Sequence, residues 1–229
     1  TGAKEMETTE YLFSQDHRVI TQRELERRIA VNELFPAQKQ EEQPKKKKPK
    51  SQKALAKTFV MIQCVGSREE SNPNCSRVCC SEAVKNAIRL KELNPFNDVF
   101  ILYRDIRTYG FKEVYYEKAR ELGVIFVRYD KDRKPEISLE EDLLKVAVVD
   151  PILNERVVLH PDLLVLSVGI VANDNLELAK FLKVPLMQDG FFLEAHAKLR
   201  PLDFSTDGVF LCGLAHSPKF TSECISQAH

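Results

Sequence analysis

Short apolar runs that alternate with helical patterns are the feature that most restricts the fold of this chain. Three of these runs are rich in Val, Ile and Phe, and they span 58–65, 98–103 and 124–129. Continuous apolar runs of this length are typical of strands buried on both faces of a parallel sheet. Amphipathic helical patterns separate them, at 76–93 and 115–122. Because strands that alternate with helices pair in parallel through right-handed crossovers, the pattern predicts an α/β, Rossmann-like fold.

The flanking sequence predicts smaller elements. Thr21 is followed three residues later by Glu24, a capping-box pattern that predicts a helix carrying Leu25 and Ile29. After residue 129 we expect a hairpin, a strand, a short helix and two short strands. These are placed at 144–150 with 156–159, 162–168, 175–182, 190–193 and 209–211. Residues 36–57 are polar and rich in Lys and Pro, and we expect a flexible linker or insertion there.

Charge and composition exclude several kinds of partner. Lys and Arg together number 34, as do Asp and Glu, so the chain has no charge bias toward nucleic acid. No apolar run reaches the roughly 18 to 20 residues of a membrane-spanning helix, and the start does not resemble a signal peptide. We therefore expect a cytoplasmic protein. Thiols stay reduced there, so the six cysteines are expected to be metal ligands or buried side chains rather than disulfides.

The loop after the first strand of the alternating region holds four cysteines. Cys64, Cys75, Cys79 and Cys80 occupy the place where a dinucleotide-binding protein has a G-x-G-x-x-G turn. Gly66 is the one glycine of this loop, so we expect no NAD(P) at this strand. A helix beginning near Cys75 would put Cys75 and Cys79 on one face.

Four thiolates at a strand end and a helix N-terminus suit a [4Fe–4S] cluster, and the nearby Arg68 and Arg77 would add positive charge. Structural zinc is one alternative, although its sites usually contain C-x2-C pairs, which this chain lacks. Buried or redox thiols are another. Outside this loop, we expect Cys212, in the apolar run VFLCG, to be a buried structural thiol and Cys224 to be a surface or helix-packing thiol. No catalytic set such as Ser-His-Asp is evident, and no catalytic residue is assigned.

The segments FVMIQCVGSR, CSRVCC and AVKNAIRLKE, in this order, resemble the HdrA subunit of heterodisulfide reductase, together with its bacterial (HdrA-like) relatives. The start, Thr1-Gly2-Ala3 followed by RVITQRELERRI, and the end, TDGVFLCGLAHSPKFTSECISQA, resemble segments of the same family. The resemblance covers the chain outside its Lys-rich segment. It implies a thioredoxin-reductase-like, FAD/NAD(P)-binding fold, with a parallel sheet, flanking helices and a small β-meander.

The resemblance also implies where cofactors bind. It assigns the ligands of a [4Fe–4S] cluster to Cys64, Cys75, Cys79 and Cys80, and contacts to FAD to Thr1, Gly2, Gly213, Pro218 and Lys219. It implies four parts of the chain: a connecting segment from the FAD domain at 1–35, the linker at 36–57, the cluster-carrying Rossmann-like domain at 58–170, and a return into the FAD domain at 171–229. The sequence departs from the family in lacking a pyrophosphate fingerprint, and Leu214 stands where many related flavoproteins have Asp.

The function implied is electron relay between FAD and iron–sulfur centres, in a heterodisulfide-reductase-type complex that could use flavin-based bifurcation. The implied partners are the other proteins of that complex and an electron-donating hydrogenase or dehydrogenase subunit. We expect the chain to be an internal fragment with little or no turnover alone. Two alternatives stay open: an NAD(P)-dependent flavin reductase domain, and a zinc-stabilised interaction module without redox activity.

Overall fold

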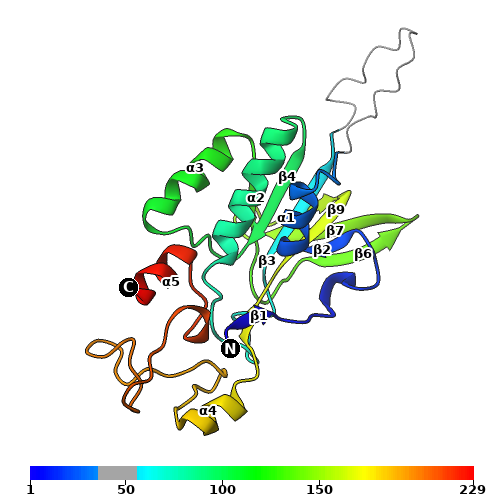
Figure 1. Ribbon diagram of the computed structural model, residues 1–229. Helices are drawn as coiled ribbons and strands as arrows, with labels where there is room; N and C mark the ends of the chain where they lie inside the picture. The colour runs from blue at the N-terminus through cyan, green and yellow to red at the C-terminus, as the bar shows by residue number, and fades with distance from the viewer. Residues whose placement is uncertain (36–55) are drawn as a thin grey trace, which may run out of the picture. The chain divides into compact units, whose positions relative to one another are not determined.

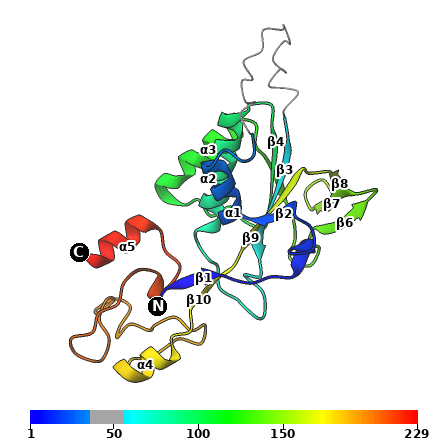
Figure 2. The same ribbon diagram turned by 45° about the vertical axis from the view of Figure 1, so that its right-hand side comes forward.

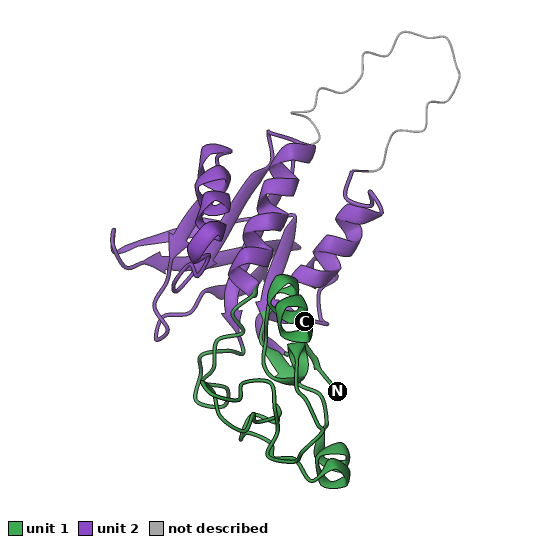
Figure 3. Cartoon of the chain, turned by 60° about the vertical axis from the view of Figure 1, so that its left-hand side comes forward, with its two compact units in different colours: residues 1–8, 66–78, 168–229 green, residues 9–65, 79–167 purple. Residues whose placement is uncertain are grey.

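The computed structural model describes residues 1–35 and 56–229 (Figure 1). The predicted linker therefore lies outside the described residues up to position 55. The described residues form two compact units (Figure 3). One unit, here called the terminal unit, combines 1–8, 66–78 and 168–229. The other, called the sheet unit, combines the described parts of 9–65 with 79–167. The loop at 66–78 is thus part of the terminal unit, whereas the strand before it and the helix after it are parts of the sheet unit.

The sheet unit is built on a five-stranded sheet with the order β2-β9-β3-β4-β5. In that order the strands span Val19–Thr21, Leu163–Val168, Thr58–Val65, Asp98–Tyr103 and Ile125–Arg128. The pairs β2–β9, β3–β4 and β4–β5 are parallel. Every residue of β9 and all but the first of β3 are buried, as expected of strands covered on both faces. The predicted Rossmann-like alternation is confirmed, and β2 is an additional strand that the sequence did not indicate.

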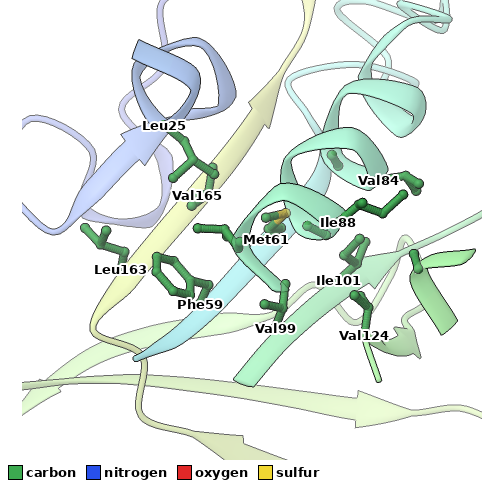
Figure 4. Close-up of a cluster of buried hydrophobic side chains, with 14 of the residues drawn as sticks. Leu25, Phe59, Met61, Val84, Ile88, Val99, Ile101, Val124, Leu163 and Val165 are labelled. Atoms are coloured by element: carbon green, nitrogen blue, oxygen red, sulfur yellow. The ribbon is translucent and has the colours of Figure 1, made fainter. Parts of the chain in front are cut away.

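Three helices cover one face of this sheet. They are α1 (Gln22–Ala30), α2 (Cys79–Leu93) and α3 (Glu113–Glu121), the last preceded by a 3-10 turn, η3 (Gly110–Lys112). Figure 4 shows Phe59 and Met61 of β3 meeting Leu25 of α1 and Val84 of α2 in one apolar cluster. All four side chains are fully buried. This cluster fixes α2 over the strand that precedes it, which is the arrangement that brings the end of β3 close to the start of α2.

A small antiparallel sheet lies on the side of the parallel sheet away from the helices (Figure 2). Its strands, in the order β6-β7-β8, are Glu136–Glu140, Leu143–Asp150 and Glu155–Leu159. The predicted hairpin is therefore confirmed as β7 and β8, and the meander is completed by β6. β6 was not predicted, although its sequence, EISLE, alternates polar and apolar residues as a strand does, and most of its side chains are exposed.

Thr21 begins α1 as predicted, since its hydroxyl accepts a hydrogen bond from the Glu24 amide at 3.3 Å. The Glu24 carboxylate, in the first turn, accepts hydrogen bonds from Arg27 and Arg28 in the last turn of the same helix, at 2.8 Å each. These two cations, Arg27 first, lower the pKa of Glu24 to about 2.

The terminal unit contains one two-stranded sheet, in which β1 (Ala3–Glu5) pairs antiparallel with β10 (Ile170–Ala172). Its helices are α4 (Leu176–Leu182), which confirms the predicted short helix, and α5 (Thr221–Ala228). The 3-10 turn η4 spans Gly213–Ala215, and a further 3-10 turn in the sheet unit, η1, spans Glu10–Leu12. The strands predicted at 190–193 and 209–211 are wrong. Those residues form only the isolated bridges Leu186↔Phe192 and Asp203↔Phe210.

Within the described residues, no helix is both long enough and apolar enough to cross a membrane.

Candidate functional site

The four cysteines of the predicted ligand set lie on three different elements. Cys64 is the penultimate residue of β3, and Cys79 and Cys80 are the first two residues of α2. Cys75 lies in the loop at 66–78, four residues before that helix starts. The expectation that Cys75 and Cys79 share a helix face is therefore wrong. Arg77 has a φ of 59°, and the Val78 amide donates to the Ser76 carbonyl at 2.6 Å, so the chain makes a turn where the helix was predicted to begin.

Three residues in and beside the cysteine loop have a strained backbone conformation. Cys64, Arg68 and Arg77 adopt the left-handed conformation, with φ values of 64°, 60° and 59°. For a residue with a Cβ atom, that conformation costs roughly 1 to 2 kcal/mol. A dinucleotide-binding turn would use glycine at the strand end, whereas this chain holds a cysteine there. Non-glycine residues kept in such conformations cluster at functional sites.

Each thiol of this region has its own surroundings. Cys64 and Cys80 are buried, with 6% and 5% of their surface exposed, whereas Cys75 and Cys79 are partly exposed. The Cys80 thiol donates to the Asp105 carbonyl at 3.6 Å, so the loop after β4 contacts the cysteine motif directly. The Cys75 sulfur accepts from the Arg77 amide at 3.3 Å.

The donor set fits an iron–sulfur cluster or zinc by its chemistry. None of the six cysteines, all of them among the described residues, forms a disulfide. Within the part of the chain that the structure describes, however, no three His, Cys, Asp or Glu side chains are arranged to hold a metal ion. Binding of a single ion such as zinc therefore requires local rearrangement. That rearrangement includes loss of the Cys80–Asp105 hydrogen bond, because a metal-bound thiolate has no proton to donate.

The five residues assigned to FAD contacts all lie in the terminal unit. A Cβ atom on Gly2 would lie 4.0 Å from both the Leu214 Cβ and the Asn173 Nδ2, so the start of the chain is next to the turn that contains Gly213. The Asn173 side chain also donates to the Thr1 carbonyl at 3.0 Å. Two segments that are about two hundred residues apart in sequence therefore meet.

Arg77 connects the cysteine loop to the second of these segments. Its guanidinium donates to the Pro218 carbonyl at 3.1 Å and forms an ion pair with Glu223 at 2.7 Å. A cavity of about 280 Å³ lies beside this connection, within the terminal unit, and is lined by Cys75, Arg77, Ser217 and Pro218 among others. The sequence indicated Arg77 as a source of positive charge near the thiols, but not that its guanidinium is engaged by Glu223.

Charged side chains surround the segment at 213–223. Burial, followed by the positive charge of Arg77, lowers the pKa of Lys219, whose ammonium donates to the Ser217 hydroxyl at 2.7 Å. His216 lies 2.9 Å from the Glu194 carboxylate through its Nε2 atom. A backbone N–H bond holds the pKa of Glu194 low against the effect of burial, and His216 adds to this. No sequence pattern paired these two residues.

The two cysteines outside the motif differ from each other. The prediction that Cys212 is buried is wrong, because it is exposed. Its backbone is extended, so neighbouring side chains alternate between the two sides and Leu211 takes the buried position. Cys224 is partly buried on α5, and its sulfur would lie 3.5 Å from a Cβ atom on Gly213. This agrees with the prediction of a helix-packing thiol.

Comparison with known proteins defines the class. No protein-family model matches the chain. Among solved structures, thioredoxin reductase from T. acidophilum superposes with a TM-score of 0.55, over 99% of this chain and 60% of the other, at 14% sequence identity. The fold is therefore that of the thioredoxin-reductase-like, FAD/NAD(P)-binding Rossmann proteins.

Curated relatives narrow the class to a family. The HdrA subunit of the ferredoxin:CoB-CoM heterodisulfide reductase of Methanosarcina acetivorans is 41% identical over 177 residues, 75% of this chain and 22% of the relative. The HdrA subunit of the H(2)/formate:CoB-CoM heterodisulfide,ferredoxin reductase of Methanococcus maripaludis is 39% identical over 239 aligned residues, 100% of this chain and 34% of the relative. Over the matched residues, the chain belongs to the HdrA-like family of heterodisulfide reductases. It spans about a third or less of the length of these relatives.

Proposed function

We propose that this chain is the electron-transfer part of a heterodisulfide-reductase-type iron–sulfur flavoprotein. In this proposal Cys64, Cys75, Cys79 and Cys80 hold a [4Fe–4S] cluster. The segments at Thr1-Gly2 and 213–219 contact FAD, whose remaining binding groups come from outside this sequence. When bound, the cluster accepts and releases single electrons, and FAD exchanges them singly or in pairs.

The observation that carries the proposal is the connection made by Arg77. One residue links the loop of Cys75 to the segment assigned to FAD, through Pro218 and Glu223. Electron transfer between two cofactors needs them close together and rigidly held. The Arg77 guanidinium ties the loop to Pro218 and Glu223, outside the loop, and the Arg77 amide holds the Cys75 sulfur within it, which meets that need better than a mobile loop would.

The protein's own residues also prepare the site for negative charge. The Arg77 amide donates to the Cys75 sulfur, and the helix N-terminus of α2 begins at Cys79 and Cys80. Partial positive charge at a helix N-terminus favours thiolates over thiols. The buried positions of Cys64 and Cys80 would keep water away from a cluster, which is one of the influences on its potential.

Partners follow from the relatives' names. One matched relative is named for H(2) or formate together with a heterodisulfide and ferredoxin. We therefore propose that the whole protein works in a complex with the other heterodisulfide-reductase-type subunits and an electron-donating hydrogenase or dehydrogenase subunit. A heterodisulfide and ferredoxin in one name suggest two electron acceptors. Flavin-based bifurcation divides the electrons of one donor between two acceptors, and we include it in the proposed function.

The test is metal analysis of the full chain after anaerobic reconstitution with iron and sulfide. Wild type should bind about four Fe and four sulfides per chain with a broad visible absorption, and Cys79→Ser should lose most of both. Cys212→Ser is the matched control, because Cys212 is an exposed thiol outside the motif, and it should keep the full content. One zinc per chain and no retained iron would instead support a zinc-stabilised interaction module.

A calorimetric titration with NADH and NADPH addresses the remaining alternative. The proposal expects no binding, because Cys64 takes the left-handed position at the strand end and Gly66 is the one glycine of the loop. Micromolar binding of either nucleotide would favour an NAD(P)-dependent flavin reductase domain.

A further inference from the structure

Gln63 is a buried amide that lacks a hydrogen-bonding partner. Its side chain is fully buried, and neither its Nε2 nor its Oε1 has a partner among the described residues. Its backbone carbonyl accepts a hydrogen bond from the Tyr129 hydroxyl at 2.6 Å, so this position of β3 is held in place. Burying an amide without a partner is unfavourable, and such a group calls for a specific explanation.

The orientation of Gln63 follows from the alternation of β3. Phe59 and Met61 point from this strand toward the helices (Figure 4), and Gln63, two residues further on, continues the same face. It thus lies under the helices at the carboxyl end of the strand. The next residue, Cys64, ends the regular part of the strand with its left-handed backbone.

Several other polar side chains at this end of the sheet unit are hydrogen-bonded to one another. Ser167 ends the helix-facing row of β9, and its hydroxyl accepts from the Gln22 amide at 3.2 Å. The Gln22 side-chain oxygen in turn accepts from Asn86 of α2 at 2.9 Å. Gln22 is 4% exposed and Asn86 is 2% exposed, so these buried amides make hydrogen bonds to each other in place of water. Beside this network, both polar side-chain atoms of Gln63 lack a partner within the described part of the chain, and the Ser81 hydroxyl of α2 also lacks one.

We propose that the Gln63 Nε2 donates a hydrogen bond to a sulfur atom of the iron–sulfur centre, and that this bond raises the reduction potential of that centre. The inference rests on the proposed function. Gln63 adjoins Cys64, and the same unit carries Cys79 and Cys80 at the start of α2. The sulfide and thiolate sulfurs of a bound cluster would give the Gln63 Nε2 the acceptor that it lacks among the described residues of the metal-free chain. Reduction makes the centre more negative, so an N–H donor stabilises the reduced state more than the oxidised one.

The test is Gln63→Met, which keeps the length of the side chain and removes its polar atoms. In the metal-free full chain this variant should fold more favourably, with a several-fold larger folding constant in urea denaturation, because an unpaired amide has been removed. In the reconstituted chain it should keep the iron and sulfide content of wild type. Its midpoint potential, measured by a redox titration followed by electron paramagnetic resonance, should fall by about 59 mV, which corresponds to a tenfold change for one electron.

Gln22→Met is the matched control, because Gln22 is a buried amide of the same sheet unit whose hydrogen bonds are made. It should destabilise the metal-free chain and leave the midpoint potential where it is in wild type. A Gln63→Met protein with normal iron content and an unchanged midpoint potential would overturn this inference but not the proposed function. A lower stability of the metal-free Gln63→Met chain would do the same. Wild type that takes up no iron would overturn the proposed function, and the inference with it.

Discussion

The ion pair between Arg77 and Glu223 gives a sharp test of the connection between the cysteine loop and the segment assigned to FAD. Replacing Arg77 by Met keeps the stem of the side chain and the backbone preference. It removes the 2.7 Å ion pair and the 3.1 Å bond to the Pro218 carbonyl. The two side chains of the pair are 35% and 37% exposed, so the pair contributes about 1 kcal/mol at most. The bond from a charged donor to Pro218 adds about 1 kcal/mol after a similar reduction for exposure. We expect Arg77→Met to cost about 2 kcal/mol in total.

A double-mutant cycle isolates the pair. Glu223→Gln should cost about 1 kcal/mol, and the double variant about 2 kcal/mol, because the pair can be lost only once. The coupling energy is then about 1 kcal/mol. The assay is native-state hydrogen exchange of the α5 amides, such as that of Cys224, which donates to the Phe220 carbonyl at 3.0 Å. Costs of the single variants that simply add, or unchanged exchange in α5, would refute the structural connection.

The pH dependence of this coupling has a definite sign. Burial pushes the pKa of Glu223 up, but the Phe220 amide and the Arg77 guanidinium outweigh it, and the pKa lies below its usual range. A lowered folded-state pKa means that the contribution is complete above the ordinary Glu value of about 4.3. The coupling should therefore be constant near neutral pH and disappear as the pH falls through the folded-state pKa.

Three further outcomes follow from other parts of the structure. Asp16→Asn should lower the free energy of unfolding by about 1 to 2 kcal/mol at pH 7. Hydrogen bonding to Arg18 lowers the Asp16 pKa to about 2, so the deficit should shrink as the pH of the denaturation experiment falls from about 4 toward 2. Leu25→Ala, at a fully buried position of α1, should cost about 2 to 4 kcal/mol in urea denaturation, and a cost under about 1 kcal/mol would contradict the packing described. Gly169→Ala would put a Cβ atom 2.9 Å from the Gly66 carbonyl oxygen. It should displace the cysteine loop and reduce iron uptake, whereas normal uptake would show that the loop adjusts without penalty.

The fold could be predicted from the sequence where hydrophobic periodicity is strong and contacts are local. The bounds of β3 and β4 agree with the predicted ones, because both are apolar runs that end in turns or polar residues. The pairing of β1 with β10 could not be predicted. Each strand has three residues, and Ala3 pairs with Ala172, so no local pattern reports the contact.

The start of α2 was misplaced for a physical reason. Arg77 is a residue type that gives no turn signal, yet it adopts a left-handed backbone that delays the helix to Cys79. The loop at 66–78 supplies its own hydrogen bonds, and Arg77 is fixed by Glu223, 146 residues away. The spacing of the cysteines was thus enough to select the candidate ligands. The backbone conformation around Cys75 could not be predicted, because it depends on residues far away in the sequence.

The left-handed backbone at Cys64 also limits how this position can change in evolution. Glycine would adopt a φ of 64° without steric strain, but glycine has no thiol. Asn and Asp tolerate this conformation better than other residues that carry a Cβ atom, but only cysteine supplies the thiolate that the proposed cluster needs. Folding and metal binding therefore select different residues at one position. In a library that varies residue 64 completely, sorting for folded protein should enrich glycine, whereas sorting for iron content should return cysteine alone.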